Sequence, residues 1–367
     1  MTPLPAGPRC LTLGGQALPL ISPARVYLCG ITPYDVTHLG HAATFVWADA
    51  ATSIMRMAGV EVLVCRNVTD IDDVLTIAAA ERETPYDVLA ATQEYLFDQD
   101  MTALRVRPPT YTPRARRHVD RVIELAAALL ESGHGYLRDG QVYFRGFPAI
   151  PGGVPADADE HGELTGDHTA REPHDVAVWR SSGPDEPAWP SPWGLGRPGW
   201  HAECAAIALS VLGSSVDLVA GGADLAFPHH AYQAALVEAA TGVRPFARSR
   251  LNVGTVGIGG EKMAKSTGNL VLVADLLREH SPAAIRLLLL DRDWREPWDF
   301  HPADLTASAA RLDRIYSAAG TRGEEKGSLD AVTSALLREL DVPTALDIAE
   351  EAGGDAARLV LRTLALA

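Results

Sequence analysis

Two histidines, His38 and His41, stand three residues apart in the segment THLGH at residues 37–41. At that spacing both imidazoles lie on one face of a helix. A helix N-terminus attracts phosphate, because its first N–H groups have no partner in the helix and its dipole is positive there. Gly40 would let a flat base or a ribose approach the backbone. The segment therefore indicates a nucleotide site, although an ordinary helix start with two surface histidines fits the same residues.

Two lysines, Lys262 and Lys265, stand in the glycine-flanked segment GGEKMAKS at residues 259–266. Paired ammonium groups on such a loop concentrate positive charge and can stabilise a departing pyrophosphate. A solvated surface loop has the same composition. The order and separation of the two segments, about 220 residues apart, nevertheless resemble the paired HIGH and KMSKS signatures of class I aminoacyl-tRNA synthetases.

A third group of residues offers thiol and imidazole side chains: Cys29 after an apolar run, Cys204 in the segment GWHAEC, and His229 in FPHH. Thiolate and imidazole are ligands that zinc accepts readily. Spacing alone does not predict a metal site, because the chain contains no Cys-x-x-Cys pair. Buried cysteines beside a satisfied histidine remain the alternative, and Cys10 and Cys65 are expected to be structural.

The elements that must position these residues alternate between short apolar strands and helical patterns. Strands are expected at 25–29, 61–68, 177–179, 216–220 and 251–258. Helices are expected between them at 38–57, 72–82, 86–104, 114–130, 202–212 and 230–241. This alternation predicts an α/β fold with a Rossmann-like, doubly wound parallel sheet, whose carboxyl edge binds ligands.

The chain is expected to divide near residue 270. Residues 20–270 would form the Rossmann-like catalytic domain, with a connective insert at about 135–175 that opens on an Asp-Gly hairpin. Residues 271–367 would form a helical C-terminal domain, with helices at 273–279, 282–290, 303–319, 329–340 and 355–366. Residues 1–24 are rich in Pro and Gly and are expected to be an irregular lead-in.

Composition indicates a globular, cytoplasmic protein. Apolar residues make up 47% of the 367 residues and charged residues 22%, which excludes a disordered chain. No apolar stretch is long enough to cross a membrane, and no secretion signal is expected at the N-terminus. Four cysteines are too few for a disulfide scaffold and fit a reducing compartment. The net charge of −15 disfavours an extended nucleic-acid surface.

Longer segments around these motifs resemble the cysteinyl-tRNA synthetase superfamily over residues 25–320, and within it the mycothiol-biosynthesis ligases that join cysteine to glucosaminyl-inositol. The resemblance is carried by CGITPYDVTHLGHA at 29–42, RNVTDIDD at 66–73, RPGWH at 197–201, GGAD at 221–224, FPHH at 227–230 and the segment 262–269. The ITPYD form favours the ligases, because the tRNA enzymes usually have PTVYD. The resemblance implies a class I synthetase catalytic domain.

By this resemblance Cys29, Cys204 and His229 match the zinc ligands of the superfamily. Three protein ligands leave a fourth position for the sulfur of the substrate cysteine, which serine cannot match. A metal–sulfur bond discriminates better than pocket shape, because a methylene-sized difference changes binding by only about 1–3 kcal/mol.

The resemblance also implies roles for the remaining site residues. His38, His41, Lys262 and Lys265 match the catalytic groups that stabilise the phosphates of ATP, with Mg²⁺ bridging them. Residues that would contact the cysteinyl-adenylate are Cys29, Gly30, Ile31, Thr32, Thr44, Asn67, Val68, Thr69, Trp200, Gly222, Ala223, Asp224 and Val256.

Three departures from the resemblance bear on the second substrate. Gln233 stands where the tRNA enzymes carry a zinc-binding Glu, and the ligases also lack that Glu. Ala264 replaces a serine in the lysine segment, which removes a hydroxyl and keeps both charges. Residues 147–175 lack the ERGGDP stretch of the mycothiol enzymes.

The expected activity is therefore an ATP-dependent, AMP-forming ligation of L-cysteine to the amine of glucosaminyl-inositol by a monomer, with no tRNA or membrane partner. A pathway-specific paralogue with another amine acceptor stays open, as does a truncated cysteinyl-tRNA synthetase. Only 67 residues follow residue 300, fewer than a helical bundle and an anticodon-reading domain would need.

Overall fold

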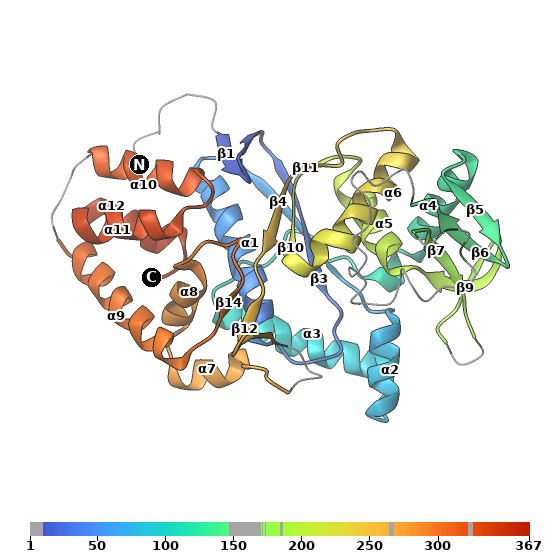
Figure 1. The fold of residues 1–367 in the computed structure, drawn as a ribbon, viewed down its shortest axis with the longest axis horizontal. Coiled ribbons are helices and arrows are strands. Elements are labelled where there is room, and N and C mark those ends of the chain that lie inside the picture. Colours follow the sequence, from blue (N-terminus) through green and yellow to red (C-terminus); the bar gives the residue numbers. More distant parts are fainter. Residues whose placement is uncertain are drawn as a thin grey trace.

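A four-stranded parallel sheet lies at the centre of the computed structural model, which describes residues 10–146, 170, 172, 174–183, 186–263, 268–321 and 326–367. The strand order is β11 (Ala247–Val253), β10 (Val216–Gly222), β3 (Ala24–Ile31) and β4 (Val62–Val68) (Figure 1). All three strand pairs are parallel. Beyond β4, isolated bridges join Cys65 to Tyr111 and Val68 to Arg114. The expected parallel α/β sheet is confirmed.

Alternating side chains of β3 face two different hydrophobic layers. Val26 and Leu28 pack into the layer that contains α1 (Leu39–Met57). Tyr27 and Cys29 pack into the layer formed by α4 (Val119–Glu131), α5 (Trp200–Leu212) and α6 (Ala231–Thr241). Successive side chains of a strand point to opposite faces of its sheet. The thiol of Cys29 therefore lies on the α5 side of the sheet.

A second, five-stranded antiparallel sheet forms the region that follows α4. Its strands run in the order β5 (Gly135–Arg138), β6 (Gln141–Phe144), β7 (Val176–Ser181), β9 (Gly194–Pro198) and β8 (Trp189–Ser191). The expected hairpin is confirmed, with Asp139 and Gly140 both at positive φ as its turn requires. Most of the expected exposed insert, at residues 147–169, lies outside the described residues. The strand predicted at 177–179 is β7 of this antiparallel sheet rather than a strand of the parallel sheet, and β7, β8 and β9 all lie past residue 175.

The helices α2 (Asp73–Glu81) and α3 (Tyr86–Ala103) follow β4 as predicted. The predicted helix at 114–130 begins later than expected: a 3₁₀ turn at Ala115–Arg117 precedes α4. The predicted strand at 251–258 is two strands, because the chain bends at Gly254. A Cβ at Gly254 would lie 2.4 Å from the carbonyl oxygen of Glu296. The second strand, β12 (Val256–Ile258), pairs with β13 (Glu261–Lys262) and β14 (Trp298–Asp299).

Helices dominate the chain after residue 270, as expected. They are α7 (Val273–Glu279), α8 (Pro282–Leu290), α9 (Pro302–Ala319), α10 (Lys326–Leu337), α11 (Val342–Ala352) and α12 (Gly354–Thr363). The sequence did not predict α11, a short helix capped by Asp341 and ended by the glycines 353 and 354. Buried side chains of these helices belong to the same hydrophobic cluster as α1 and one face of the parallel sheet.

A buried ion pair joins α8 to α1. Arg286 is fully buried and lies 2.8 Å from the carboxylate of Asp49. The same guanidinium donates to the carbonyl oxygens of Leu104, at 2.8 Å, and Leu364, at 3.0 Å. Four segments far apart in the sequence therefore meet at the Arg286 guanidinium.

The lead-in predicted for residues 1–24 is not irregular over residues 10–19, which form the hairpin β1 (Cys10–Leu13) and β2 (Gln16–Pro19). Its turn residues Gly14 and Gly15 have positive φ. Their amides donate to the carboxylate of Glu339, at 2.7 and 2.9 Å, from the turn between α10 and α11. Among the described residues, no helix is long and apolar enough to span a bilayer.

Candidate active site

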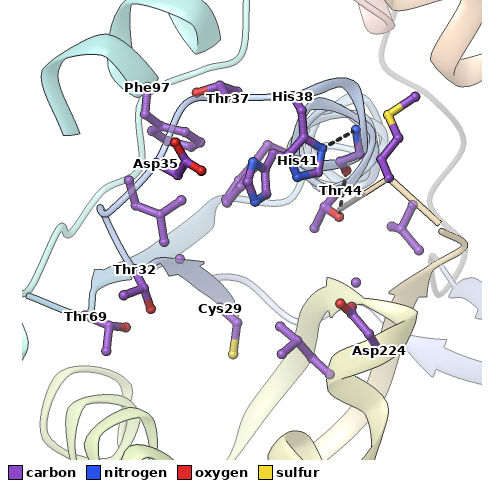
Figure 2. Close-up of a pocket in the computed structure, with 18 of the residues that line it drawn as sticks. Cys29, Thr32, Asp35, Thr37, His38, His41, Thr44, Thr69, Phe97 and Asp224 are labelled. Carbon is purple, nitrogen blue, oxygen red and sulfur yellow. Dashed lines mark hydrogen bonds between the residues drawn. The ribbon is translucent and has the colours of Figure 1, made fainter. Parts of the chain in front are cut away.

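A cavity of about 900 Å³ opens at the carboxyl edge of the parallel sheet (Figure 2). Such an edge is where open α/β sheets bind ligands. The structure brings most of the predicted site residues to its lining: Cys29, Gly30, Ile31, Thr32, His38, His41, Thr44, Asn67, Thr69, Trp200, Cys204, Gly222, Asp224, His229, Val256 and Lys262. Val68 and Ala223 do not line it, and Lys265 lies outside the described residues.

Three of the lining residues form a cluster of metal-ligand type. One donor atom each from Cys29, Cys204 and His229 lies within 4.8 Å of the other two, and all three side chains are buried. Cys29 lies near the carboxyl end of β3, Cys204 lies in the second turn of α5, and His229 lies in the turn between β10 and α6. A tetrahedral zinc with bonds near 2.0–2.3 Å has its ligand atoms roughly 3.6 Å apart. The donor set and its spacing therefore fit zinc.

The two thiols of this cluster interact with each other. A hydrogen bond to Cys204 and then burial raise the pKa of Cys29 well above its usual value. The same hydrogen bond lowers the pKa of Cys204, with further help from His229 and from the hydroxyl of Tyr27. The pKa values of the two thiols are therefore shifted in opposite directions, and the thiolate is the form in which cysteine binds metals.

Two residues that the sequence did not single out support the Cys29 sulfur. The side-chain amide of Asn252 lies 3.0 Å from Nδ1 of His230, and its Nδ2 is a donor only. His230 therefore accepts at Nδ1 and carries its hydrogen on Nε2, which lies 3.2 Å from Sγ of Cys29. The sequence could have indicated His230 as the second histidine of the FPHH segment, whereas nothing in the sequence indicated Asn252.

Asn67 links the sulfur cluster to the end of β3. Its side-chain oxygen accepts from the amide of Gly30 at 2.9 Å, and its amide donates to Thr69 at 3.0 Å and to Sγ of Cys204 at 3.5 Å. A Cβ at Gly30 would lie 1.6 Å from the carbonyl oxygen of Asn67. Only glycine fits this close approach of β3 and β4 beside Cys29.

Aromatic rings enclose the His229 side of the cluster. The ring of Trp200 stacks on His229, with centroids 4.2 Å apart. Nδ1 of His201 lies 3.0 Å from Nδ1 of His229, and the His201 ring stacks on Tyr232. Gln233 is fully buried and donates to the carbonyl oxygen of Cys204 at 3.3 Å. Gln233 therefore packs beside the Cys204 backbone, and among the described residues the cluster contains Cys29, Cys204 and His229 without a carboxylate as a fourth member.

The two histidines of the THLGH segment lie side by side at the start of α1. His38 is the N-cap residue, and its Nδ1 accepts from the amide of Gly40 at 3.1 Å. That bond leaves the hydrogen on Nε2. The His41 ring lies 3.9 Å from the His38 ring, and both line the cavity (Figure 2).

Both imidazoles of this pair are neutral at pH 7. Burial lowers the pKa of His38, and the carboxylate of Asp35 offsets only part of this effect. Crowding by protein atoms and the neighbouring His38 lower the pKa of His41 to about 3, although its ring is open to the cavity. The pair therefore offers N–H donors to a ligand rather than full positive charge.

The positive charge that the described residues place in this part of the cavity comes from Lys262. Its Nζ lies 3.1 Å from Oδ2 of Asp224, which follows β10. The turn before Lys262 uses Gly259 and Gly260, both at positive φ, so the predicted glycine-flanked segment is a β-hairpin. Residues 264–267, including Ala264, lie outside the described residues.

The cavity has one further side, formed by the loop after β3 together with α2 and α3. Tyr34, Asp35, Glu81 and Phe97 line it. Figure 2 shows Asp35 next to Phe97 and near His41, with Thr32 and Cys29 on the opposite side of the hollow. The sequence prediction assigned no role to these residues.

A family model described as the catalytic domain of class I (C) tRNA synthetases matches residues 21–310. The chain belongs to this synthetase family. A ligase from Kribbella flavida named L-cysteine:1D-myo-inositol 2-amino-2-deoxy-alpha-D-glucopyranoside ligase is 44% identical over 337 residues, which are 88% of this chain and 83% of the relative. A protein from Legionella pneumophila named cysteine–tRNA ligase is 42% identical over 301 residues, 80% of this chain and 65% of the relative.

Solved structures of the synthetase family share the fold at low identity. Methionyl-tRNA synthetase of Mycobacterium tuberculosis, in complex with methionyl-adenylate, is 17% identical with a TM-score of 0.62, over 94% of this chain and 82% of that one. A leucyl-tRNA synthetase of Agrobacterium radiobacter is 11% identical with a TM-score of 0.66, over 94% of this chain and 83% of that one. These likenesses agree with the predicted synthetase fold.

Proposed function

We propose that the protein is an AMP-forming ligase that activates L-cysteine with ATP and joins it to the amine of glucosaminyl-inositol in mycothiol biosynthesis. The observation that carries this proposal is the opening of the Cys29, Cys204 and His229 cluster into the cavity that His38 and Lys262 also line. Relatives named for that ligation, at 41–44% identity over most of the chain, support it. We assign the chemistry to residues 20–270 and a supporting role to residues 271–367, whose helices pack against α1.

Selection of cysteine is the task of the buried cluster. Cys29, Cys204 and His229 would hold zinc, which when bound supplies a Lewis acid that prefers sulfur over hydroxyl oxygen. Around it, Asn67 and His230 orient the two sulfurs through their hydrogen bonds. Trp200 closes one side of the pocket by stacking on His229.

Adenylate formation requires the cysteine carboxylate to attack the α-phosphate of ATP. The Nε2 hydrogen of His38 points a donor at this charge, and the neutral His41 ring lies beside it. Lys262 and Lys265 would neutralise the leaving pyrophosphate, and the Mg²⁺ that the family implies would supply further positive charge there. To reach the phosphates, Lys262 must break its contact with Asp224. The Asp224 carboxylate can then accept hydrogen bonds from the ribose hydroxyls.

Amide formation follows when the acceptor amine attacks the carbonyl carbon of cysteinyl-adenylate and AMP leaves. Positioning of the amine and the mixed anhydride in one enclosed cavity supplies much of the rate. Buried thiols at the site must stay reduced for this chemistry, so we place the enzyme in the cytoplasm.

The test is mass spectrometry of products after incubation with cysteine, ATP and glucosaminyl-inositol, beside cysteine-dependent exchange of labelled pyrophosphate into ATP. We expect pyrophosphate exchange with cysteine in the absence of any acceptor, and exchange with serine that is lower by several orders of magnitude. When glucosaminyl-inositol is added, we expect cysteinyl-glucosaminyl-inositol and AMP as products. Exchange without product formation from glucosaminyl-inositol would contradict the proposed acceptor, and a panel of other amines then tests for a paralogue.

Charging of tRNA is the second candidate, favoured by the 42% identity to the cysteine–tRNA ligase of Legionella pneumophila. The same exchange assay separates the two. Formation of cysteinyl-tRNA that added glucosaminyl-inositol does not reduce would support the second candidate. AMP release that depends on the amine would support the first.

A further inference from the structure

The cavity contains a carboxylate wall that neither cysteine nor ATP uses in the proposed reaction. Asp35, Tyr34 and Glu81 line it, and the buried Phe97 closes it from behind. The sulfur cluster lies across the hollow from Asp35, as the position of Cys29 in Figure 2 shows. A third reactant therefore has space between this wall and the site where the adenylate would form.

The carboxylate of Asp35 is held rigidly at that wall. Arg82, which directly follows α2, contacts Oδ1 of Asp35 at 3.1 Å and the carbonyl oxygen of Tyr34 at 2.8 Å. The amide of Val36 donates to the same Oδ1 at 2.9 Å. Only 16% of the Asp35 side chain is exposed. A charged group fixed in this way is prepared for a ligand, because it loses little freedom on binding.

Lys262 pairs with Asp224, whereas Asp35 and Glu81 line a different wall of the cavity. Asp35 lies near His41 on that wall (Figure 2), and Arg82 pairs with its Oδ1. Carboxylates repel the anionic phosphates of ATP and attract a cation. An amine acceptor arrives from water largely as an ammonium group, which has three donors and no acceptor.

We infer that Asp35 binds the ammonium group of the acceptor amine, with Tyr34 and Glu81 beside its sugar hydroxyls. This inference rests on the proposed ligation and assigns the acceptor to one wall of the cavity. Tyr34 offers an aromatic face and a hydroxyl, and Glu81 is an exposed carboxylate at the mouth. Both are groups that hold a polyhydroxylated cation.

The transfer step balances with Asp35 in this place. The ammonium first gives one proton to the Asp35 carboxylate, which frees the lone pair on nitrogen. That pair forms the C–N bond at the carbonyl carbon, and the C–O bond of the mixed anhydride breaks, with its electron pair leaving on the phosphate of AMP. The second proton on nitrogen is then lost to the departing phosphate or to water. No oxidant or further reactant is needed.

The test uses Asp35→Asn in the full chain, because asparagine keeps the shape and the oxygen that accepts from Val36. Two acceptors are compared: glucosaminyl-inositol, which is cationic, and hydroxylamine, which is a small neutral nucleophile that captures the adenylate. We expect the KM for glucosaminyl-inositol to rise about 10–100-fold, the loss of one charge-assisted hydrogen bond. The kcat of transfer to this acceptor should fall as well, because asparagine cannot accept the ammonium proton. Capture by hydroxylamine and pyrophosphate exchange should stay within about twofold of wild type, since neither uses a cationic acceptor.

Two further variants complete the design. Asp35→Glu retains the charge, so its KM for glucosaminyl-inositol should lie between those of wild type and Asp35→Asn. Glu83→Gln removes an exposed carboxylate near α2 that does not line the cavity, so it should leave this KM at the wild-type value. An unchanged acceptor KM in Asp35→Asn, or equal losses with both nucleophiles, would overturn the inference and leave the ligase proposal intact. Wild-type enzyme that makes adenylate but never transfers it to glucosaminyl-inositol would instead reject the proposed function.

Discussion

Asn252 donates a hydrogen bond to Nδ1 of His230, and this contact directs the Nε2 hydrogen of His230 toward the sulfur of Cys29. The first hydrogen bond joins β11 to the turn after β10, and the second joins that turn to the Cys29 sulfur near the end of β3. A hydrogen bond from an outer residue fixes the orientation of a metal ligand and tunes its basicity. The sulfur cluster thus depends on a residue that does not line the cavity.

We expect Asn252→Ala to weaken zinc binding by about 10–100-fold, the usual effect of removing an outer hydrogen-bond partner. His230 would then lose the contact that fixes its tautomer. Zinc affinity is measured by competition with a chromogenic chelator. Gln99→Ala serves as the control, because Gln99 lies on an exposed face of α3. Equal zinc affinity in wild type and Asn252→Ala would refute the outer role of this residue.

Cys204→Ser should abolish stoichiometric zinc and with it cysteine-dependent pyrophosphate exchange, because a serine hydroxyl does not deprotonate readily to bind the metal. Cys65→Ala is the matched control. Cys65 is also a buried thiol, with its pKa raised by burial to about 12, yet it lies outside the three-ligand cluster. Metal content by plasma emission spectrometry separates the two variants. Zinc retained by Cys204→Ser at wild-type stoichiometry would exclude Cys204 as a ligand.

Gly40→Ala should reduce pyrophosphate exchange by about 10–100-fold, because small displacements of a catalytic group have effects of that size. The new Cβ would lie 2.9 Å from Cε1 and 3.0 Å from Nδ1 of His38, so the ring must move away from its N-cap position. Gly327→Ala adds the same methyl group in α10, where a Cβ meets nothing within 4 Å. Similar exchange rates in the two variants would show that the His38 orientation is unimportant.

Acidification should destabilise the protein partly through His41. Its folded pKa is lowered to about 3, below the ordinary value for histidine, so the unfolded chain binds a proton that the folded one refuses. The stabilisation from the neutral ring is present above pH 6.5 and is lost as the pH falls from there toward 3. Melting temperatures between pH 7.5 and pH 5 should therefore fall less steeply for His41→Gln than for wild type. Parallel slopes would contradict the lowered pKa.

Arg286→Met should lower the free energy of unfolding by about 3–5 kcal/mol, because it leaves the buried carboxylate of Asp49 without its cation. Denaturant unfolding measures this loss. Arg338→Met breaks an exposed ion pair with Asp341 and should cost at most about 1 kcal/mol. A comparable small loss in both variants would show that the buried contact between α8 and α1 is not a stabilising element.

Most of the parallel sheet could be predicted from the sequence because β3, β4 and β10 are largely apolar and are followed by helical patterns. The strand β11 contains Arg248 and Arg250 and was predicted only from residue 251. The hairpin at β1 and β2 was missed, since its strands of four residues are short and much of their stabilisation comes from Glu339, distant in sequence. The helix α11 was also missed, although its buried residues Val342, Ala345, Leu346 and Ala349 follow helical spacing and Pro343 stands in its first turn.

The site was predictable only where a motif was long. The spacing of Cys29, Cys204 and His229 could not reveal a cluster, because three separate elements bring them together and only the family resemblance joined them. Arg82 and Asn252 belong to no motif that the sequence analysis used, and Asp35, although it ends the ITPYD segment, was assigned no role. Their importance follows from contacts across the sheet edge, which sequence alone does not encode in any short window. The roles of the individual site residues stay predictions.

Leu28 and Cys29 are neighbours in β3, yet one packs against α1 and the other against α5. Sliding this strand by a single position would exchange the two layers and carry the sulfur to the wrong face of the sheet. An insertion or deletion within the eight residues of β3 would therefore separate the cysteine-binding site proposed here from the hydrophobic interior that keeps the molecule folded.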